Sequence, residues 1–460
     1  MSGNGFSHQP IKVENIATKY RTIKTAIPVP ESIPMLKKMY QIEAQAMHGQ
    51  FPMVWDRADD FQIYDQWGNV WLDFTSTIFV ANAGHGNERI TNALKKALDK
   101  PLLHTYTYAS SERIQYLEYL IKNTPKQFEK AFLLSAGTES TDAALKLMRL
   151  NGQKYGKRKG GVICFNGAYH GRTMGAQMMT GNKQAKEWVG YDDPNIHHLE
   201  FPYPWAVKNP TEFFNNSIEK LLKSYDLDPD QDLCGFMLET FQGWGAVFYP
   251  KEFVQEVSLF AKENDLLLTF DEMQAGFGRT GELFGYMNYD VEPDILACGK
   301  GASSSLPLSI VLGKKEIMDL PDIGSMSSTH SANPLVCAAG LANIKALIED
   351  GLIENSKNLG KIFHNKLNIL LRKYPNYISS IQGVGLLAAV IFTNPNGEPL
   401  SKLCDLISEK CLQTGLLVVH TGRESIKLAP PLVINLEELN EGVETFLDAV
   451  DQSINELYGS

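Results

Sequence analysis

Short apolar strand patterns alternate with helical patterns through the middle of the chain, and this alternation limits the possible folds more than any other feature. Helical periodicity of 3.6 residues marks residues 138–150, 251–262 and Pro334–Glu349. Strands that are apolar throughout, with helices between them, are typical of βα units around a buried, mostly parallel sheet. The runs that predict these strands are residues 131–134, 162–165, 235–238, 266–270, 295–297 and 309–312.

The two ends of the chain differ in pattern from the middle. Residues 51–75 predict a small sheet with a turn at 65–68, and the chain beyond residue 350 predicts long helices that flank short strands near 385–392 and 416–419. We therefore expect an α/β protein in which residues 81–345 form a large cofactor-binding domain. Residues 1–80 and 346–460 are expected to build a smaller α+β domain together.

Composition argues against several classes of partner. The chain has 43 Lys and Arg against 53 Asp and Glu, a net charge of −10, and it lacks a basic run, which disfavours nucleic acid and anionic membranes as partners. The polar segment 1–20 does not resemble a signal peptide, and the apolar stretches are too short to span a membrane. Six cysteines are scattered singly, which predicts reduced thiols in a cytoplasmic protein and no metal site.

Residues 134–140 run from a predicted strand directly into a predicted helix. At such a helix start, Gly137 and Thr138 would present backbone N–H groups and the positive end of the helix dipole, an arrangement that binds phosphate. The alternative is that Thr138 only caps the helix with its hydroxyl, which is the default role of threonine at this position.

A carboxylate pair follows the apolar run 266–270. Ligands gather beyond the carboxyl ends of strands in open α/β sheets, so Asp271 is placed for a ligand and Glu272 should point the other way. A solvated loop acid is the alternative. The next residues, 276–281, match the glycine pattern of dinucleotide-binding loops, but they do not directly follow the strand, and the residues behind them disfavour the required helix.

Lys300 stands between Gly299 and Gly301, just after a predicted strand. A surface lysine is the ordinary expectation, but flanking glycines let the backbone pack closely while the amine projects into a cavity. A lysine, a phosphate-binding loop, a strand-end aspartate and the aromatic loop 169–172 together form the set of groups that pyridoxal phosphate requires.

Several segments, in the same order, resemble those of class III aminotransferases, which are pyridoxal-phosphate enzymes of fold type I, the aspartate aminotransferase-like α/β fold. The resemblance extends from near residue 30 to the end of the chain and is to the 4-aminobutyrate, ornithine and omega-amino acid aminotransferases. It implies a large domain with a mostly parallel central sheet, and it accounts for residues 276–281 without a dinucleotide. The segments are residues 135–139, 168–173, 239–243, 270–281, Lys300, 328–334 and 428–432.

The resemblance implies three catalytic residues. Lys300 matches the lysine that holds pyridoxal 5′-phosphate as a Schiff base and moves a proton at the substrate Cα. Its amine must be unprotonated, a state that burial and a nearby cation favour. Asp271 matches the residue that keeps the pyridine nitrogen protonated. Tyr169 matches the aromatic residue that stacks on the ring.

The resemblance also implies further cofactor contacts. Gly137 and Thr138 match the phosphate-binding pair, and Gln274 matches the partner of the phenolic oxygen, with Glu239 as the buried acid behind it. Thr329 matches a threonine that reaches the phosphate of the neighbouring subunit. A shared site of this kind implies a homodimer, or a dimer of dimers.

The substrate residues depart from the family pattern. Trp244 and Lys427 replace the Glu and Arg that form a gate for the α-carboxylate in many relatives that use glutamate, and lysine lacks the bidentate fork of arginine. Arg172 and Arg423 match positions where some relatives bind a carboxylate. Ile78 follows a threonine where relatives carry glycine, which predicts a narrower pocket.

These features predict an aminotransferase that moves an amino group between an amino acid or primary amine and an oxo acid by a ping-pong mechanism. A racemase or epimerase of the same family is the alternative, because some relatives return the Cα proton to the opposite face. A decarboxylase is a weaker alternative. Residues 276–281 are the only support for a dehydrogenase, and a non-catalytic binding protein would give Lys300 no role.

Overall fold

A computed structural model describes residues 6–154 and 159–459 of the chain. The chain divides into two compact units. One unit is Glu88–Glu354, and the other combines the two chain ends, Met1–Asn87 and Asn355–Ser460. The first five residues of the polar N-terminal segment lie outside the described residues.

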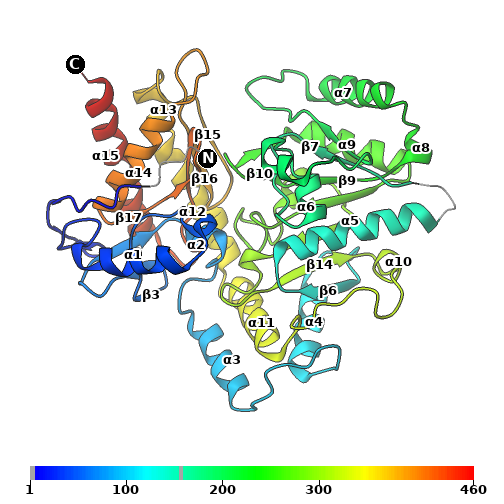
Figure 1. Cartoon of the computed structure of the whole chain (residues 1–460), viewed down its shortest axis with the longest axis horizontal. Coiled ribbons are helices and arrows are strands. Elements are labelled where there is room, and N and C mark those ends of the chain that lie inside the picture. The colour runs from blue at the N-terminus through cyan, green and yellow to red at the C-terminus, as the bar shows by residue number, and fades with distance from the viewer. Residues whose placement is uncertain (1–5, 155–158, 460) are drawn as a thin grey trace. The chain divides into compact units, whose positions relative to one another are not determined.

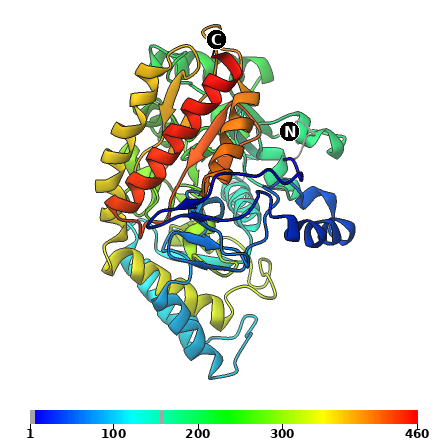
Figure 2. The same cartoon turned by 90° about the vertical axis from the view of Figure 1, so that its left-hand side faces the viewer.

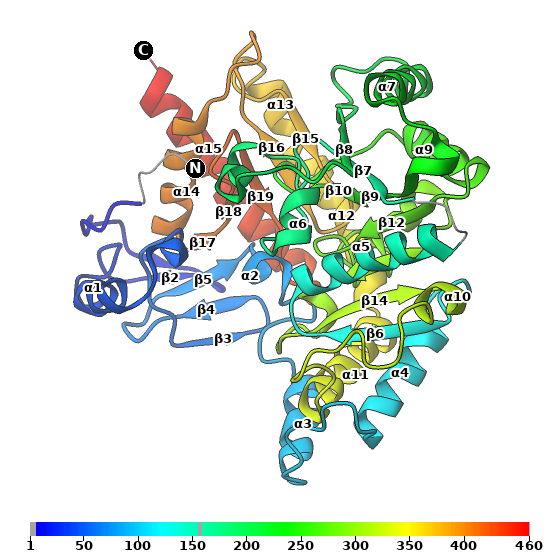
Figure 3. The same cartoon turned by 45° about the vertical axis from the view of Figure 1, so that its right-hand side comes forward.

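The described part of the Glu88–Glu354 unit contains a seven-stranded sheet with the order β6-β14-β13-β12-β9-β7-β8 (Figure 3). Neighbouring strands from β13 to β8 are parallel, whereas β14 is antiparallel to both β13 and β6. The strands are β6 (Lys130–Leu134), β7 (Gly161–Phe165), β8 (Ile196–Leu199), β9 (Leu233–Glu239), β12 (Leu267–Asp271), β13 (Ile295–Cys298) and β14 (Ser309–Gly313). All six predicted strands are therefore confirmed, and β8 is an additional edge strand whose two histidines interrupt the apolar pattern.

Burial on both faces explains the composition of this sheet. Every residue of β9, β12 and β13 is buried, as expected for parallel strands covered by helices, and every residue of the antiparallel β14 is buried as well. The helix α5 (Gly137–Lys154) lies along the sheet (Figure 1) and buries Ala144 and Leu147 in the core beneath it. Because β9 and β12 are parallel and in register, their last residues, Glu239 and Asp271, lie side by side at one edge.

Further helices complete this unit. They are α3 (Glu88–Leu98), α4 (Ser111–Asn123), α6 (Met174–Met179), α7 (Pro210–Tyr225), α8 (Pro229–Asp232), α9 (Lys251–Glu263), α10 (Lys315–Met318) and α11 (Pro334–Glu349), with the short pair β10 (Phe241–Gln242) and β11 (Val247–Phe248). The helices α7 and α9 pack against each other, and α11 packs on α3 and α4. The predicted helices correspond to α5, α9 and α11, whereas α3, α4 and α7 are not among those that the sequence pattern indicated.

The unit built from the chain ends contains two small sheets. One has the order β1-β2-β5-β4-β3, and β17 joins it in parallel with β5, which unites both chain ends in one sheet. The other is antiparallel, with the order β15-β16-β19-β18. The strands are β1 (Ile16–Ala17), β2 (Thr22–Ile23), β3 (Arg57–Asp59), β4 (Gln62–Tyr64), β5 (Val70–Asp73), β15 (Ser380–Gln382), β16 (Ala388–Ile391), β17 (Leu416–Leu417), β18 (Val419–His420) and β19 (Ser425–Leu428).

The helices of this unit are α1 (Ile33–Ile42), α2 (Ser76–Phe79), α12 (Leu352–Leu367, which crosses from the other unit), α13 (Ile369–Lys373), α14 (Ser401–Gln413) and α15 (Leu436–Tyr458). Figure 2 shows α15, in red, beside α14, in orange. Asn435 and Glu438 form a capping box at the start of α15, which satisfies the first free N–H groups of this long helix.

Among the described residues, no helix combines the length and the apolar character needed to cross a membrane. All six cysteines lie among the described residues, and each is a buried free thiol. Burial raises the pKa of the Cys234 and Cys337 thiols to about 12, so these side chains behave as small apolar core residues rather than as nucleophiles.

Candidate active site

A cavity of about 300 Å³ lies at the carboxyl ends of β9 and β12. It brings together every predicted cofactor residue except Thr329, which is exposed and lies outside the cavity lining. The residues that line it are Ala136, Gly137, Thr138, Tyr169, His170, Gly171, Arg172, Glu239, Asp271, Met273, Gln274 and Lys300. The parallel sheet therefore collects side chains from segments that are far apart in sequence.

The loop before α5 is held by Glu139 rather than by Thr138. The Glu139 carboxylate accepts hydrogen bonds from the backbone N–H groups of Ser135 and Ala136 at 2.9 and 2.8 Å. The Thr138 hydroxyl lies 2.5 Å from the Thr173 hydroxyl, so the structure does not show the helix cap that was the alternative for Thr138.

Glycine is required at the start of α5 and next to Lys300. A Cβ atom at Gly137 would lie 2.7 Å from the sulfur of Met273, and one at Gly299 would lie 2.6 Å from the same sulfur. Both distances are too short for a side chain, so the two glycines let Met273 pack between the α5 loop and the lysine loop. The close packing expected for the glycine before Lys300 is thus present.

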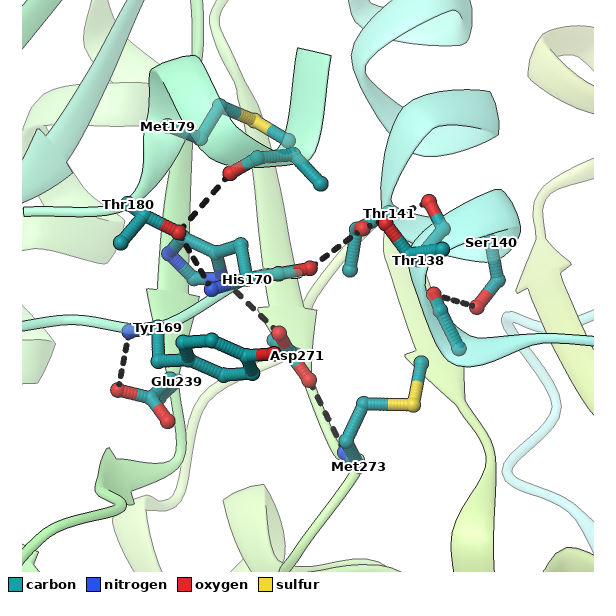
Figure 4. Close-up of polar contacts among 12 residues, drawn as sticks. Thr138, Ser140, Thr141, Tyr169, His170, Met179, Thr180, Glu239, Asp271 and Met273 are labelled. Carbon is teal, nitrogen blue, oxygen red and sulfur yellow. Dashed lines mark hydrogen bonds and ion pairs between the residues drawn. The ribbon is translucent and has the colours of Figure 1, made fainter. Parts of the chain in front are cut away.

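Asp271 is buried at the end of β12 and makes two hydrogen bonds (Figure 4). Its Oδ1 accepts the backbone N–H of Met273 at 3.0 Å, and its Oδ2 lies 2.9 Å from Nδ1 of His170. The alternative of a solvated loop acid is therefore wrong, because only 4% of Asp271 is exposed.

His170 is a site residue to which the sequence assigned no role. Its Nε2 atom is buried, and no hydrogen-bond partner for it exists among the described residues. An unpaired lone pair is less costly to bury than an unpaired N–H, so His170 carries its proton on Nδ1 and donates it to Asp271. The position of Asp271 at the end of an apolar strand could not predict its contact with His170, because the two residues are 101 positions apart in the sequence.

Glu239 lies beside Asp271 and supports the aromatic loop. Its Oε2 accepts the backbone N–H of Tyr169 at 3.1 Å. A Cβ atom at Gly243 would lie 2.1 Å from Nε2 of Gln274 and 3.1 Å from Oε1 of Glu239, so both side chains gather at this glycine. Burial, helped by the charge of Asp271, raises the pKa of Glu239 to about 7.

The raised pKa of Glu239 predicts a pH-dependent stability of the protein. Between pH 4.5 and 7 the unfolded chain releases this proton while the folded chain keeps it, so the free energy of unfolding should fall by about 3 kcal/mol as pH rises. Glu239→Gln removes the titration while keeping an acceptor for Tyr169. We expect urea unfolding to show that the free energy of unfolding falls less with pH in Glu239→Gln than in wild type. The exposed Glu219→Gln is the control and should show the wild-type fall. An equal fall in Glu239→Gln would contradict the assignment.

Lys300 begins the turn that follows β13 and is half-buried. Burial lowers the pKa of its ammonium, and the carboxylates of Asp271 and Glu239 act in the opposite direction without reversing the effect. Its backbone adopts a φ of 44°, which is unusual for a residue other than glycine and is typical of a constrained functional position. The protein thus favours the neutral amine by burial.

Glu272 points away from the cavity, as the alternation along the strand predicted. Its carboxylate accepts hydrogen bonds from the Thr240 hydroxyl at 2.6 Å and from the backbone N–H groups of Gly285 and Tyr286 at 2.7 Å each. Residues 276–284 form turns and bends. Since a dinucleotide fingerprint must open a helix, this loop is a structural support and the nicotinamide interpretation is wrong.

The substrate candidates are divided between the two units. Arg172 lines the cavity, with its guanidinium carbon 5.8 Å from the centre of the Tyr169 ring. Trp244 is outside the cavity lining and donates its indole N–H to Gln242 at 2.8 Å. The structure therefore brings Arg172, but not Trp244, together with the predicted cofactor residues.

Three further substrate candidates belong to the unit of the chain ends. Lys427 is buried on β19 with its ammonium 4.7 Å from the centre of the Phe79 ring. Arg423 pairs with the neighbouring Glu424 at 2.8 Å. Ile78 is partly exposed within α2, where residues 76–79 all have positive φ values between 46° and 68°. Such a left-handed run of non-glycine residues is strained.

Comparisons with known proteins identify the family of this chain. The family model described as aminotransferase class-III matches residues 44–450. An acetylornithine aminotransferase from Clostridium acetobutylicum is 30% identical over 88% of this chain and 97% of its own length. An alanine/serine racemase from Pyrococcus horikoshii is 28% identical over 98% of this chain and 96% of its own length.

A solved transaminase from the marine bacterium Virgibacillus superposes with a TM-score of 0.83 at 25% identity, covering 92% of this chain and all of that one. Sequence and fold thus point to the same group of enzymes. The chain belongs to the class III aminotransferase family, and it has that family's fold type I architecture and its cofactor, pyridoxal 5′-phosphate.

Proposed function

We propose that the cavity at the ends of β9 and β12 is the cofactor site, and that the enzyme moves an amino group between an amino acid or primary amine and an oxo acid in two half-reactions. One observation carries the proposal: the cavity joins a lysine with a lowered ammonium pKa to a buried strand-end aspartate. We further propose that Glu88–Glu354 is the cofactor domain, and that the enzyme is cytoplasmic, as its single free thiols suggest.

The described residues fit pyridoxal 5′-phosphate. The start of α5 offers backbone N–H groups and a positive dipole to a phosphate, and Gly137 lets Met273 pack closely against this loop. Asp271 offers a buried carboxylate to a protonated ring nitrogen. Gln274 offers an amide for a phenolic oxygen, with Glu239 beside it. Each polar part of the cofactor thus has a partner of suitable chemistry in one cavity.

When bound, pyridoxal phosphate supplies an electron sink that stabilises negative charge at the substrate Cα. Lys300 would hold the cofactor covalently and move the proton at Cα, for which its neutral amine is the competent form. Asp271, itself oriented by His170 and by the N–H of Met273, would hold a proton on the ring nitrogen. Tyr169 would cover the ring.

An absorbance spectrum and a donor panel test this function. The purified enzyme should show the band of bound cofactor, and amino acids and amines should yield products with pyruvate or 2-oxoglutarate. Chiral analysis of the recovered donor separates transamination from the racemase or epimerase alternative, which the relative from Pyrococcus horikoshii keeps relevant. Racemised donor without net amino transfer would overturn the proposal.

We propose that the enzyme is a homodimer, or a dimer of dimers, and that Thr329 contacts the phosphate bound by the partner subunit. Thr329 is exposed and absent from the cavity lining, which fits a role outside its own subunit. Thr329→Ala should weaken cofactor retention. A mixed dimer can combine one Thr329→Ala subunit with one Lys300→Ala subunit. If the sites are shared, one site then carries both substitutions and the other carries neither, so the mixed dimer should keep about half of the wild-type activity. Inactive mixed dimers would contradict a shared site.

We propose that the enzyme prefers donors other than glutamate, since Lys427 and Trp244 replace the family's carboxylate gate. Without the bidentate hydrogen bonds of an arginine, the transition state for glutamate should lose about 1.5–3 kcal/mol of stabilisation, which lowers kcat/KM for glutamate roughly 10- to 150-fold. We expect alanine or isoleucine to exceed glutamate, and Lys427→Arg with Trp244→Glu to shift the ratio toward glutamate. A wild-type preference for glutamate, or an unchanged ratio in the double variant, would refute this prediction.

A further inference from the structure

A chain of short hydrogen bonds connects the phosphate-binding candidate Thr138 to a carboxylate outside the cavity. The Thr138 hydroxyl lies 2.5 Å from the Thr173 hydroxyl, which in turn donates to Oδ2 of Asp142 at 2.5 Å. The backbone N–H of Thr173 also donates to the Thr138 oxygen at 3.2 Å. The other carboxylate oxygen of Asp142 accepts the backbone N–H of Ala176, in the first turn of α6, at 2.6 Å.

Two glycines make this chain of contacts possible. A Cβ atom at Gly171 would lie 2.4 Å from the Thr138 hydroxyl oxygen, and one at Gly175 would lie 2.5 Å from Oδ1 of Asp142. No side chain fits at either position without moving these polar atoms. The local backbone is therefore shaped to let the hydroxyl of Thr138 and the carboxylate of Asp142 approach the segment 171–176.

The number of protons determines the direction of each hydrogen bond. A carboxylate only accepts, so the single hydroxyl proton of Thr173 points to Asp142. The short contact between the two threonine hydroxyls then needs a proton from Thr138. The hydroxyl proton of Thr138 is thus directed away from the cavity, toward Thr173, and the backbone N–H of Thr173 occupies one of the oxygen's lone pairs.

We propose that Asp142, acting through Thr173, is a positioning residue that competes with the cofactor's phosphate for the hydroxyl proton of Thr138. Phosphate needs donors, so Thr138 must break its bond to Thr173 before its hydroxyl can serve the phosphate. Asp142 therefore holds the affinity for phosphate below the value that the same cavity would otherwise reach. This inference rests on the proposed role of Thr138 in phosphate binding.

Asp142→Asn reverses the chain of hydrogen bonds with almost no change in shape. The Ala176 N–H needs an acceptor, so the amide oxygen must face it, and the amide N–H₂ then donates to the Thr173 hydroxyl. Thr173 in turn donates to Thr138, whose own proton becomes available to the cavity. Thr173→Val releases the same proton by removing the acceptor, and it changes no charge.

The test compares ligands with and without a phosphate on the full-length apoenzyme. Dissociation constants are measured for pyridoxal 5′-phosphate, for pyridoxal and for inorganic phosphate, by absorbance or calorimetry. We expect Asp142→Asn to bind both phosphate-bearing ligands roughly 2- to 10-fold more tightly, the range for one competing hydrogen bond, with pyridoxal unchanged. Thr173→Val should tighten them in the same way. Asp226→Asn, at the exposed C-terminal end of α7, is the charge-matched control and should not differ from wild type.

Each other outcome overturns the inference. Unchanged or weaker phosphate binding in Asp142→Asn would mean that Asp142 only caps α6. Tighter binding in Asp142→Asn but not in Thr173→Val would mean that charge alone acts. An equal gain for pyridoxal would mean that the effect does not involve the phosphate. The wild-type enzyme separates failure of this inference from failure of the proposed cofactor site. If it does not bind pyridoxal 5′-phosphate more tightly than pyridoxal, the proposed cofactor site is wrong as well; if it does, only the role of Asp142 is wrong.

Discussion

Lys300→Ala should lower turnover by more than about 10⁴-fold while leaving the protein folded. A general acid or base alone contributes about 10²- to 10⁴-fold, and Lys300 is assigned both the proton transfer at Cα and the covalent attachment of the cofactor. The residue is half-buried, and burial lowers the pKa of its ammonium, so alanine removes an amine whose charged form is unfavourable in the folded state, and folding should not depend on it. Steady-state kinetics and thermal unfolding measure the two effects separately.

Borohydride reduction followed by peptide mapping checks the assignment independently of rate. Wild type should retain the cofactor on the peptide that contains Lys300, and the variant should retain none. The exposed Lys220→Ala, on α7, provides a control with the same change of residue and should keep full activity. More than a trace of activity in Lys300→Ala, or a reducible link at another lysine, would show that the catalytic amine lies elsewhere.

Asp271→Asn should retain the cofactor but lose about 10³-fold in the rate of each half-reaction. An ion pair about 4 Å apart at an effective dielectric constant of 20 is worth about 4 kcal/mol, and each 1.36 kcal/mol is a factor of ten in rate. Single-turnover measurements with a donor amine report this loss without the second half-reaction. A rate within a few-fold of wild type would assign the protonation of the ring nitrogen to another residue.

The same substitution should also affect His170. The asparagine oxygen must accept the N–H of Met273, so its N–H₂ group faces Nδ1 of His170 and forces the ring proton onto the buried Nε2. An unpaired buried N–H costs about 1–3 kcal/mol, which we expect as a loss in the free energy of unfolding of the apoenzyme. Asp226→Asn, at the exposed C-terminal end of α7, is the matched control. Unchanged stability of Asp271→Asn would contradict the tautomer assigned to His170.

Apolar periodicity predicted six of the seven strands of the large sheet, because strands covered on both faces must be apolar along their whole length, and helical periodicity predicted α5, α9 and α11 but not α3, α4 and α7. The six predicted strands became β6, β7, β9, β12, β13 and β14, and the predicted turn at 65–68 joins β4 and β5, which pair in antiparallel. The residue types next to each predicted strand also identified individual candidate site residues. Asp271 was marked by its place after an apolar strand, and Lys300 by its flanking glycines.

Only the tertiary structure decided which side chains contact one another. The pairing of His170 with Asp271, the packing of Met273 between Gly137 and Gly299, and the hydroxyl contact between Thr138 and Thr173 all join segments that meet through the parallel sheet. A local pattern carries no information about such distant pairs.

The sequence by itself determined the fold class and the order of the predicted strands, because these depend on burial periodicity, and its motifs of a few residues predicted the residues of a pyridoxal-phosphate site. The tertiary structure decided the hydrogen-bond partners of the site residues, the raised pKa of Glu239 and the lowered pKa of Lys300. Those properties depend on desolvation and on neighbouring charges, which arise only when strands such as β9 and β12 place their ends side by side.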